Sequence, residues 1–235
     1  HTDATAALQL FLWIKDLASK QILECRHAVI GVTRLGSLHS AEKKIRKLAP
    51  EIFGAASFET PEKEESRGWP FGPNHIFRHV LPIALKYGEP VLWIEPDSIP
   101  TKASWFSDIL SEHSRVGGFL GSLYRSPVMH MNGVGVYPEN AIDLAPSLIT
   151  GPESVPWDVA SSDEHMFYAS DSQLFQHAWD HGTITCSTIR DNASIFHRDR
   201  NGDVVRLISE KVTGKRVPTR QELEEQMPTK YYKCS

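Results

Sequence analysis

The chain has 235 residues, of which 40% are hydrophobic and 23% are charged, and its formal net charge is −4. These values are ordinary for a globular protein, so they exclude disordered and fibrous classes, and the mild acidity excludes a strongly basic nucleic-acid binder. The length suits one sizeable hydrophobic core. We therefore expect one α/β domain over residues 1–235, with a core from about residue 26 to 208 and a C-terminal wrapping tail at 209–235.

Cysteine usage and hydropathy bear on the cellular compartment. The three cysteines, Cys25, Cys186 and Cys234, are far apart and odd in number, so they suggest neither a metal-binding spacing nor a disulfide framework. The apolar run over residues 8–14 is too short to cross a membrane and has no basic leader. The sequence thus predicts a protein of a reducing, cytoplasmic compartment with no membrane partner.

The first part of the chain predicts a helix, a strand and a second helix. Residues 4–20 carry apolar side chains at close to helical spacing, which favours an amphipathic helix packed on the domain. Residues 27–33 predict the first strand of the sheet. Ser40 then offers an N-cap for a helix over residues 41–53, whose basic side chains we expect on its solvated face.

A polar loop and a third helix follow. Residues 59–68 are charge-dense and lack periodicity, which predicts a loop of the kind that closes on ligands. Glycines and prolines in residues 68–73 then fix a particular backbone path. Asn74 can cap the next helix, which we expect over residues 75–87.

An apolar run that ends in two carboxylates is the most informative stretch. Residues 91–94 are typical of a strand buried on both faces of a parallel sheet. Glu95 and Asp97 follow, and ligands of open α/β sheets bind outside the carboxyl ends of the strands. Two such oxygen ligands on one face suit Mg²⁺ or Mn²⁺, which in turn binds a diphosphate. The alternative is a polar Glu-Pro-Asp turn that merely closes the strand.

Two glycine-containing stretches come after a helix expected over residues 105–113. Residues 117–122 predict a glycine-rich strand that lets another backbone come close. Beyond Asn132, the glycines Gly133 and Gly135 leave one sheet face without side chains, where a sugar ring has room to lie. The Asn-Gly dipeptide is equally typical of a hairpin turn, so both interpretations stay open.

A second acidic stretch lies near residue 160. Ser161 and Glu164 have the spacing of a capping box, which by itself explains Glu164 at a helix N-terminus. Asp163 is less well explained by capping, and Asp158 lies close by. Apolar residues at helical spacing then predict a helix that runs up to Gly182.

The last part of the chain predicts a strand over residues 184–189 and contains a late histidine, His197. A lone histidine is most often an ordinary core or surface residue. Residues 198–220 hold seven basic and three acidic residues, a local +4 that is either a solvated surface or a contact for a polyanion. From Val212 the chain turns polar, and residues 221–226 predict a helix in a tail that wraps the outside.

The carboxylate stretch resembles the metal and nucleotide-sugar site of GT-A fold glycosyltransferases. The shared features are an acidic-x-Asp triplet that ends an apolar strand, then Ile-Pro and a helix that contains Trp105. The first residue of the triplet is usually Asp, whereas this chain has Glu95. The resemblance covers about residues 28–208 and implies a single-domain, Rossmann-like mixed sheet flanked by helices. It also implies a nucleotide-diphosphate sugar as donor and Mn²⁺ or Mg²⁺ as cofactor.

The same resemblance implies roles for particular residues. Asp97 and His197 are the implied metal ligands, and Glu95 joins them directly, through water or by binding the ribose. Arg198 offsets the charge of the diphosphate. The remaining donor contacts implied by position, for which ordinary turn or capping roles are the alternative, are Thr33, Arg34, Arg67, Asn74, Asn132 and Gly133.

The acceptor is constrained least. In inverting members of the family a carboxylate near the start of a helix deprotonates the acceptor hydroxyl, and Asp163 fits this role ahead of Asp158; a retaining enzyme needs no such base. So short a chain with these motifs is similar to small bacteriophage enzymes that glycosylate hydroxymethylated pyrimidines in DNA, which implies the host cytoplasm. A carbohydrate acceptor, a non-catalytic nucleotide- or sugar-binding module and a phosphate-ester hydrolase are the alternatives.

Overall fold

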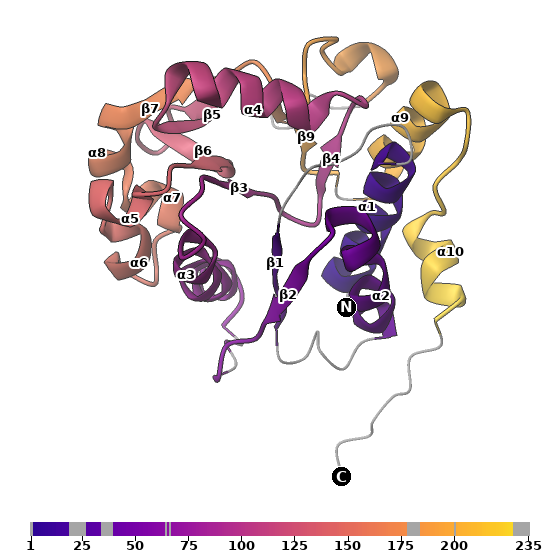
Figure 1. The fold of residues 1–235 in the computed structure, drawn as a ribbon, viewed down its shortest axis with the longest axis horizontal. Helices are drawn as coiled ribbons and strands as arrows, with labels where there is room; N and C mark the ends of the chain where they lie inside the picture. Colours follow the sequence, from indigo (N-terminus) through magenta and orange to yellow (C-terminus); the bar gives the residue numbers. More distant parts are fainter. Residues whose placement is uncertain are drawn as a thin grey trace.

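The computed structural model describes residues 2–18, 27–33, 40–63, 65, 67–177, 184–199 and 201–227. Helices flank mixed β-sheets, so the expected α/β class is confirmed (Figure 1). The helices are α1 (Thr2–Ala18), α2 (Ser40–Phe53), α3 (Phe71–Leu85), α4 (Trp105–Val116), α5 (Ala141–Leu144), α6 (Ser147–Thr150), α7 (Trp157–Ala160), α8 (Ser162–His165), α9 (Asp203–Thr213) and α10 (Arg220–Glu225), with 3₁₀ turns at Met166–Tyr168 and Cys186–Thr188. The strands are β1 (Ala28–Gly31), β2 (Ala56–Glu59), β3 (Val91–Trp93), β4 (Ser98–Pro100), β5 (Phe119–Tyr124), β6 (His130–Tyr137), β7 (Ala169–Asp171), β8 (Phe175–His177) and β9 (Ile195–His197). Over these residues, no helix combines the length and the hydropathy that crossing a membrane requires.

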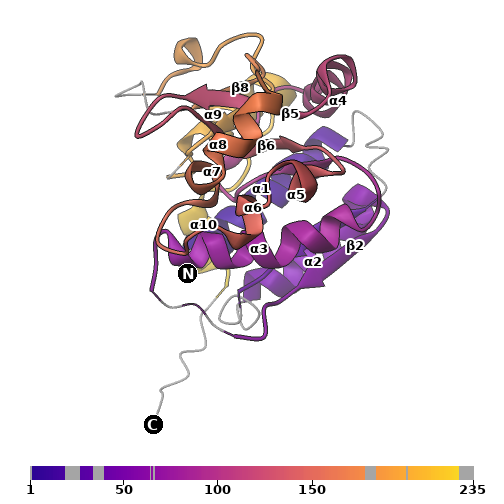
Figure 2. The same cartoon turned by 90° about the vertical axis from the view of Figure 1, so that its left-hand side faces the viewer.

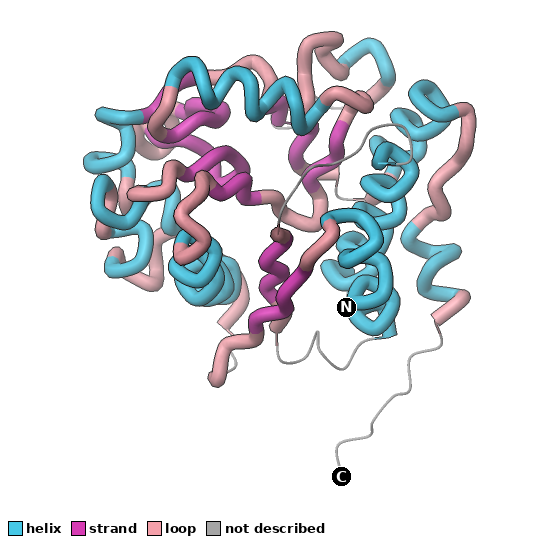
Figure 3. Tube along the Cα trace, in the orientation of Figure 1, coloured by secondary structure: helices cyan, strands magenta, loops and turns pink. Residues whose placement is uncertain are grey.

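The described strands form three sheets (Figure 3). β1 and β2 pair in parallel, and β9 lies between β4 and β8, antiparallel to the first and parallel to the second. The largest sheet has the order β3-β6-β5-β7, and β6 runs antiparallel to both of its neighbours. Figure 1 shows α4 on one side of this sheet and α3 on the other, and α5 to α8 gather beside β6 (Figure 2). This mixed arrangement is compatible with a Rossmann-like fold.

The strand that leads to the carboxylates departs from the expectation. β3 runs antiparallel to β6 at the end of the sheet order, so the expected parallel pairing is wrong. Its residues are half-buried and not fully buried. The residues of β3 are apolar for a different reason than burial in a parallel sheet. Leu92 packs on the larger hydrophobic cluster, while Val91 and Trp93 pack on the smaller one. Alternate side chains of β3 therefore join two separate cores.

The helix expected up to Gly182 is wrong for the part that the structure describes, and residues 178–182 lie outside it. α7 and α8 are single turns, after which the chain extends into β7 and β8, which pair with β5 and β9. The capping box of Ser161 and Glu164 does not form, because the Glu164 carboxylate accepts hydrogen bonds from the backbone N–H and the hydroxyl of Ser147 (2.8 and 2.9 Å). Pairing within the sheets outweighs the local helical pattern here.

One further expectation fails, and one of two open interpretations is excluded. Residues 184–189 contain a 3₁₀ turn capped by the Thr185 side chain and no strand. Asn132 and Gly133 lie inside β6 and not in a hairpin turn, because β6 pairs with strands on both of its edges. Strands β2 and β4 have no counterpart among the expected elements, since strands of three or four residues carry little periodicity. Helix α9 was also not expected, although its apolar residues recur at helical spacing. The other expected helices and strands are confirmed within a few residues.

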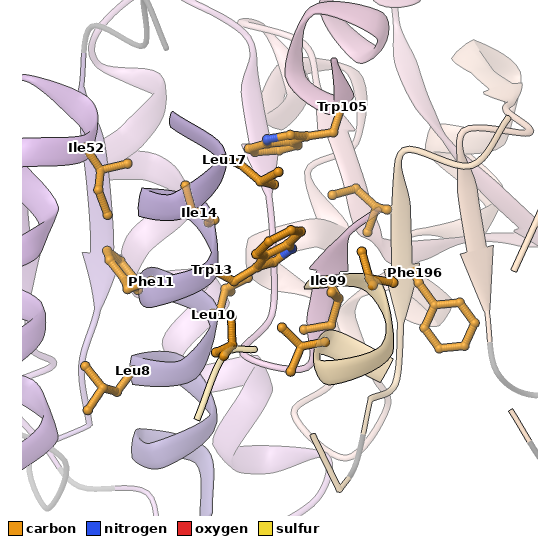
Figure 4. Packing of buried hydrophobic residues seen from close by; sticks show 14 of the residues in the cluster. Leu8, Leu10, Phe11, Trp13, Ile14, Leu17, Ile52, Ile99, Trp105 and Phe196 are labelled. Carbon is orange, nitrogen blue, oxygen red and sulfur yellow. The ribbon is translucent and has the colours of Figure 1, made fainter. Parts of the chain in front are cut away.

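The N-terminal helix fills the centre of the larger hydrophobic cluster. Trp13 and Leu17 of α1 are at most 1% exposed, and Figure 4 shows Trp13 directed toward Ile99 of β4. The Trp13 indole N–H donates a hydrogen bond to the Pro100 carbonyl (2.7 Å). Full burial of a large apolar side chain contributes about 1.5 to 3 kcal/mol. Helix α1 therefore fixes the position of β4, the strand that begins directly after Asp97.

Candidate metal centre

A tight turn holds the two carboxylates between β3 and β4. The Ser98 N–H donates to the Glu95 carbonyl (2.9 Å), and the Glu95 N–H donates to the Ser98 hydroxyl (3.2 Å). Pro96 occupies the second turn position, where its fixed φ is favourable, and serine supplies the second hydrogen bond. The local sequence therefore dictates the turn, and the turn keeps Glu95 and Asp97 close together.

Strand β9 brings a histidine to this turn. β9 pairs antiparallel with β4, and His197 lies opposite Ser98. The Asp97 carbonyl accepts a hydrogen bond from the Arg198 N–H (3.1 Å), which ties the chain after β9 to the turn. One ligand atom of each of Glu95, Asp97 and His197 lies within 4.8 Å of the others. The three residues named from the sequence as metal ligands are thus neighbours in the fold.

The charges of the three side chains support one another. His197 Nε2 lies 3.1 Å from Glu95 Oε2 and 3.3 Å from Asp97 Oδ1. Burial alone lowers the pKa of His197, but its hydrogen bonds to Asp97 and Glu95 outweigh burial and raise the pKa to about 9. Burial also opposes the charge of Asp97, yet the hydrogen bond and charge of His197 hold the Asp97 pKa below its ordinary value. The carboxylates therefore stabilise a positive charge at this point.

The donor set can hold a metal ion. Carboxylate oxygens are the ligands of hard divalent cations, and imidazole nitrogen is the commonest nitrogen ligand in proteins. The side chains of Glu95 and Asp97 are 29% and 28% exposed, whereas that of His197 is 5% exposed. The oxygens thus open toward solvent and the nitrogen comes from the interior, so a cation held here keeps coordination positions free for water or for a ligand.

Asp158 of α7 is a further carboxylate in the field of this cluster. Its two oxygens accept hydrogen bonds from the N–H groups of Gly133 (3.1 Å) and Val159 (3.0 Å). Burial raises the pKa of Asp158, the charge of His130 opposes this effect, and the negative charge of Glu95 adds to it. The hydrogen bond from the Gly133 N–H attaches Asp158 to β6. Gly133 precedes Gly135, the partner of Trp93, so it lies at the end of the pair where the chain continues from β3 to Glu95. Asp158 is therefore held on β6, where the charge of Glu95 still acts on it.

Asp163 has a different setting. It is exposed on α8 and lines a pocket together with the apolar side chains of residues 128–129 and 166–167. Phe167 on the rim of this pocket is 85% exposed. Asp163 is thus surrounded by water and a surface pocket, whereas Asp158 is half-buried and bonded to β6.

The glycine face of β6 has no room for a sugar ring at Gly133. A Cβ atom built on Gly133 would lie 2.6 Å from the Trp157 ring, and one on Gly135 would lie 2.7 Å from the Leu120 carbonyl oxygen. The glycines therefore serve the close packing of protein groups on this strand. Asn132 is 8% exposed, and its side-chain oxygen accepts a hydrogen bond from the Val134 N–H (3.1 Å) within β6.

Asn74 fastens α3 to the segment before α7. The helix begins at Phe71, so Asn74 lies inside it and does not cap it. Its amide nitrogen donates to the carbonyls of Glu153 and Val155 (both 2.8 Å), and its oxygen accepts from the Trp157 N–H (3.0 Å). Both amide hydrogens are thus used within the protein, and the residue positions α7 and Asp158 indirectly.

Arg67 is paired with protein carboxylates. Its guanidinium donates to Glu65 (2.9 Å from Nε) and to Glu153 (2.8 Å from Nη2), and it lies over the Phe71 ring. The hydrogen bonds from Arg67 lower the pKa of Glu65 to about 2. A phosphate at Arg67 would compete with both carboxylates, so the arrangement favours a role in joining the loop to α3.

The other sequence candidates occupy two places. Thr33 follows β1 and lines a small pocket with Gly72 and His75 of α3. Arg34 lies outside the described residues. Arg198 is half-buried next to the metal centre, and its positive charge helps to lower the pKa of Asp97. Thr33 and Arg198 thus lie where a ligand can reach them.

Sequence reasoning misses His177. Its Nε2 lies 3.2 Å from His197 Nδ1, and the two residues are opposite one another in the parallel pair of β8 and β9. His177 falls within the stretch expected to be helical, so only the register of the two strands reveals it.

Comparisons with protein-family models, with curated proteins and with solved structures find no significant match for this chain.

Proposed function

We propose that this chain is a GT-A type glycosyltransferase that moves a sugar from a nucleotide-diphosphate sugar to an acceptor hydroxyl. The observation that carries the proposal is the meeting of Glu95, Asp97 and His197 within 4.8 Å, although His197 lies 102 residues beyond Glu95. Exposed acidic residues often gather by chance, but a histidine that is 5% exposed between two carboxylates calls for a reason. A strand-end acidic triplet with a late histidine ligand is the arrangement that the family resemblance implies.

Mn²⁺ or Mg²⁺ is the cation that we propose for this site, held by Asp97, His197 and Glu95. When bound, such a cation supplies a Lewis acid that stabilises the negative charge of the departing nucleotide diphosphate. The guanidinium of Arg198, whose charge already acts on Asp97, is suited to pair with phosphate oxygens beside it. Thr33, which is exposed after the end of β1, is the proposed contact for the nucleoside, by the position that the family resemblance implies.

Asp158 supports the proposed base role better than Asp163 does, if the reaction inverts the sugar. A general base acts best when its pKa lies near the working pH. Burial and the charge of Glu95 raise the pKa of Asp158, and hydrogen bonds from Gly133 and Val159 hold its carboxylate in place. Asp163 is solvated and has neither advantage. This order is the reverse of the one expected from the sequence.

For the acceptor we propose a hydroxymethylated pyrimidine in bacteriophage DNA, modified in the host cytoplasm. The basic residues of the C-terminal segment lend this weak support, because Lys211 and Lys215 are exposed. Arg216 is paired with Glu222, and Arg220 bonds to Gln9 and the Asp199 carbonyl, so fewer charges are available than the sequence suggests. A carbohydrate acceptor therefore stays the competing proposal.

One assay separates these readings. The protein is incubated with Mn²⁺ and a panel of nucleotide sugars, in turn with DNA that contains 5-hydroxymethylcytosine and with free sugars, and the products are analysed by mass spectrometry. We expect a mass increase of one hexose or pentose on the modified nucleoside, abolished by EDTA. Transfer to free sugars alone would reject the DNA acceptor but keep the glycosyltransferase. Donor binding without transfer or hydrolysis would indicate a non-catalytic module, and absence of donor binding would reject the proposal.

A further inference from the structure

A second histidine lies directly behind the proposed metal ligand. His177 and His197 are opposite one another in β8 and β9, and their rings lie 4.4 Å apart at 69°. His197 Nδ1 is 3.2 Å from His177 Nε2, while His197 Nε2 faces Glu95 and Asp97. The His177 ring also packs against the edge of Tyr124, with 5.1 Å between centroids, and is 4% exposed. The strand register and this packing leave the His177 ring little freedom to move.

The hydrogen-bond partners of His197 and His177 determine which ring nitrogen of each carries a hydrogen when a cation is bound. A cation can bind His197 Nε2 only through the lone pair of that atom, so the neutral ring carries its hydrogen on Nδ1. The only group within hydrogen-bonding distance of Nδ1 recorded among the described residues is His177 Nε2, which must therefore accept. His177 then carries its own hydrogen on Nδ1, an atom that is buried and has no hydrogen-bond partner among the described residues.

The unpartnered Nδ1–H of His177 indicates that the residue has a role beyond packing. A buried N–H without an acceptor destabilises the folded protein, and a phenylalanine of similar shape would avoid this cost. The one polar contact that the ring does make is the hydrogen bond with His197. A residue retained for packing alone has no need of this nitrogen.

We propose that His177 is a positioning residue for the metal centre, which accepts the Nδ1–H of His197 and thereby directs His197 Nε2 toward the cation. This inference rests on the proposed function, because it assigns His177 to the cation site of the glycosyltransferase. Groups that hold the second nitrogen of a ligand histidine in this way typically change metal affinity by about 10- to 100-fold when they are removed.

Mn²⁺ binding without nucleotide, measured by electron paramagnetic resonance, tests the inference. We expect His177→Phe to weaken Mn²⁺ affinity at least about tenfold and His177→Gln to recover most of the loss, since its amide oxygen can accept in place of Nε2. The matched control is His113→Phe, another buried histidine with one hydrogen bond, from its Nε2 to the Gly118 carbonyl (3.0 Å). Equal affinities of the His177→Phe and His113→Phe proteins would overturn the inference and leave the proposed function intact.

A second measurement decides the matter even if His177→Phe does not fold. Nitrogen-15 spectra of the imidazoles in the Zn²⁺-loaded wild-type protein report which ring atoms carry hydrogen. We expect His197 bound through Nε2 and protonated at Nδ1, with coupling across the hydrogen bond to His177 Nε2. An unprotonated Nδ1, or a hydrogen donated from His177, would overturn the inference. Failure of the wild-type protein to bind either cation would instead reject the metal centre itself, and the role of His177 with it.

Discussion

The turn from Glu95 to Ser98 and the segment from Asp158 to Asp163 each carry two carboxylates, but the fold holds them differently. In the turn, both carboxylates contact His197, and two backbone hydrogen bonds fix the strands on either side. In the second segment, only Asp158 is attached to the sheet, through the Gly133 N–H. Asp163 stands on a single-turn helix in contact with solvent.

The difference shows what turns an acidic residue into a site residue. A carboxylate acquires a defined position and a shifted pKa when hydrogen bonds from a neighbouring strand hold it and burial removes water. Asp97 and Asp158 are both half-buried and hydrogen-bonded, and their pKa shifts have opposite directions. Burial raises the pKa of Asp158, with a smaller contribution from the charge of Glu95, whereas at Asp97 the hydrogen bond and charge of His197 outweigh burial and lower the pKa. One residue is thereby suited to hold a cation and the other to accept a proton.

The largest effect should come from replacing, one at a time, the two candidates for the general base. We expect Asp158→Asn to lower kcat by about 10²- to 10⁴-fold with donor affinity nearly unchanged, because the general base is lost while the bond from Gly133 can still form. The matched change Asp163→Asn should alter kcat by about threefold or less, since Asp163 is solvated. Steady-state kinetics decides between them, and a larger loss for Asp163→Asn would restore the order expected from the sequence. Equal small losses would point to a retaining reaction.

Within the turn, Asp97→Asn should weaken Mn²⁺ binding about 100-fold or more, because a direct ligand is removed. Loss of a group that only hydrogen-bonds to a metal ligand already lowers metal affinity by about 10- to 100-fold. The packing should survive, since the Asp97 side chain is 28% exposed. His197→Ala should weaken binding more than Glu95→Gln. Calorimetric titration with Mn²⁺ measures all three variants, and circular dichroism checks their folding. Unchanged affinity in Asp97→Asn would remove this residue from the metal site.

The pKa of His197 predicts how metal affinity depends on pH. Because that pKa is raised to about 9, the ring is protonated at neutral pH and a cation must displace one proton from Nε2. Mn²⁺ affinity should therefore rise about tenfold for each pH unit up to about pH 9 and then level off. Titrations between pH 6.5 and 8.5 measure this slope. A flat profile would mean that His197 is not a ligand.

The smallest effect concerns the proposed DNA acceptor. Replacing Lys215 and Arg216 with Ala should reduce the slope of log affinity against log salt by only about one, because Arg216 is already paired with Glu222. The control is Lys43→Ala with Lys44→Ala, two exposed lysines on α2. Binding of a modified duplex is measured by fluorescence anisotropy at several salt concentrations. An equal change in the control pair would show that the charge near α9 and α10 has no special role.

The sequence predicts the turn and the strand end that carries Glu95 and Asp97 for physical reasons that can be named. Glu95-Pro96-Asp97-Ser98 contains its own turn chemistry, and the apolar residues before it mark a strand, so both carboxylates were placed correctly at a strand end. Helices α1, α2, α4 and α10 have strong local periodicity or caps, and they too were anticipated. These features depend on residues close together in the chain.

What the sequence did not reveal depends on pairing between distant segments. Phe175–His177 looks helical by its spacing, and only the parallel partner β9 makes it a strand and carries His177 to His197. The preference for Asp158 arises partly from the hydrogen bond that it accepts from the Gly133 N–H, which lies 25 residues earlier on β6. Glu164 illustrates the same point, because its carboxylate bonds to Ser147 and not to its own helix. No local pattern specifies such partners.

The most direct test of the central claim is anomalous diffraction from a crystal of this protein soaked in Mn²⁺. We expect one strong anomalous peak among Glu95, Asp97 and His197, at coordination distances of about 2.1 to 2.3 Å from Asp97 and from His197 Nε2. The same soak of an Asp97→Asn crystal should leave that position without a peak. A wild-type crystal with no peak at these residues, or with its main peak on other ligands, would contradict the assignment of the metal centre.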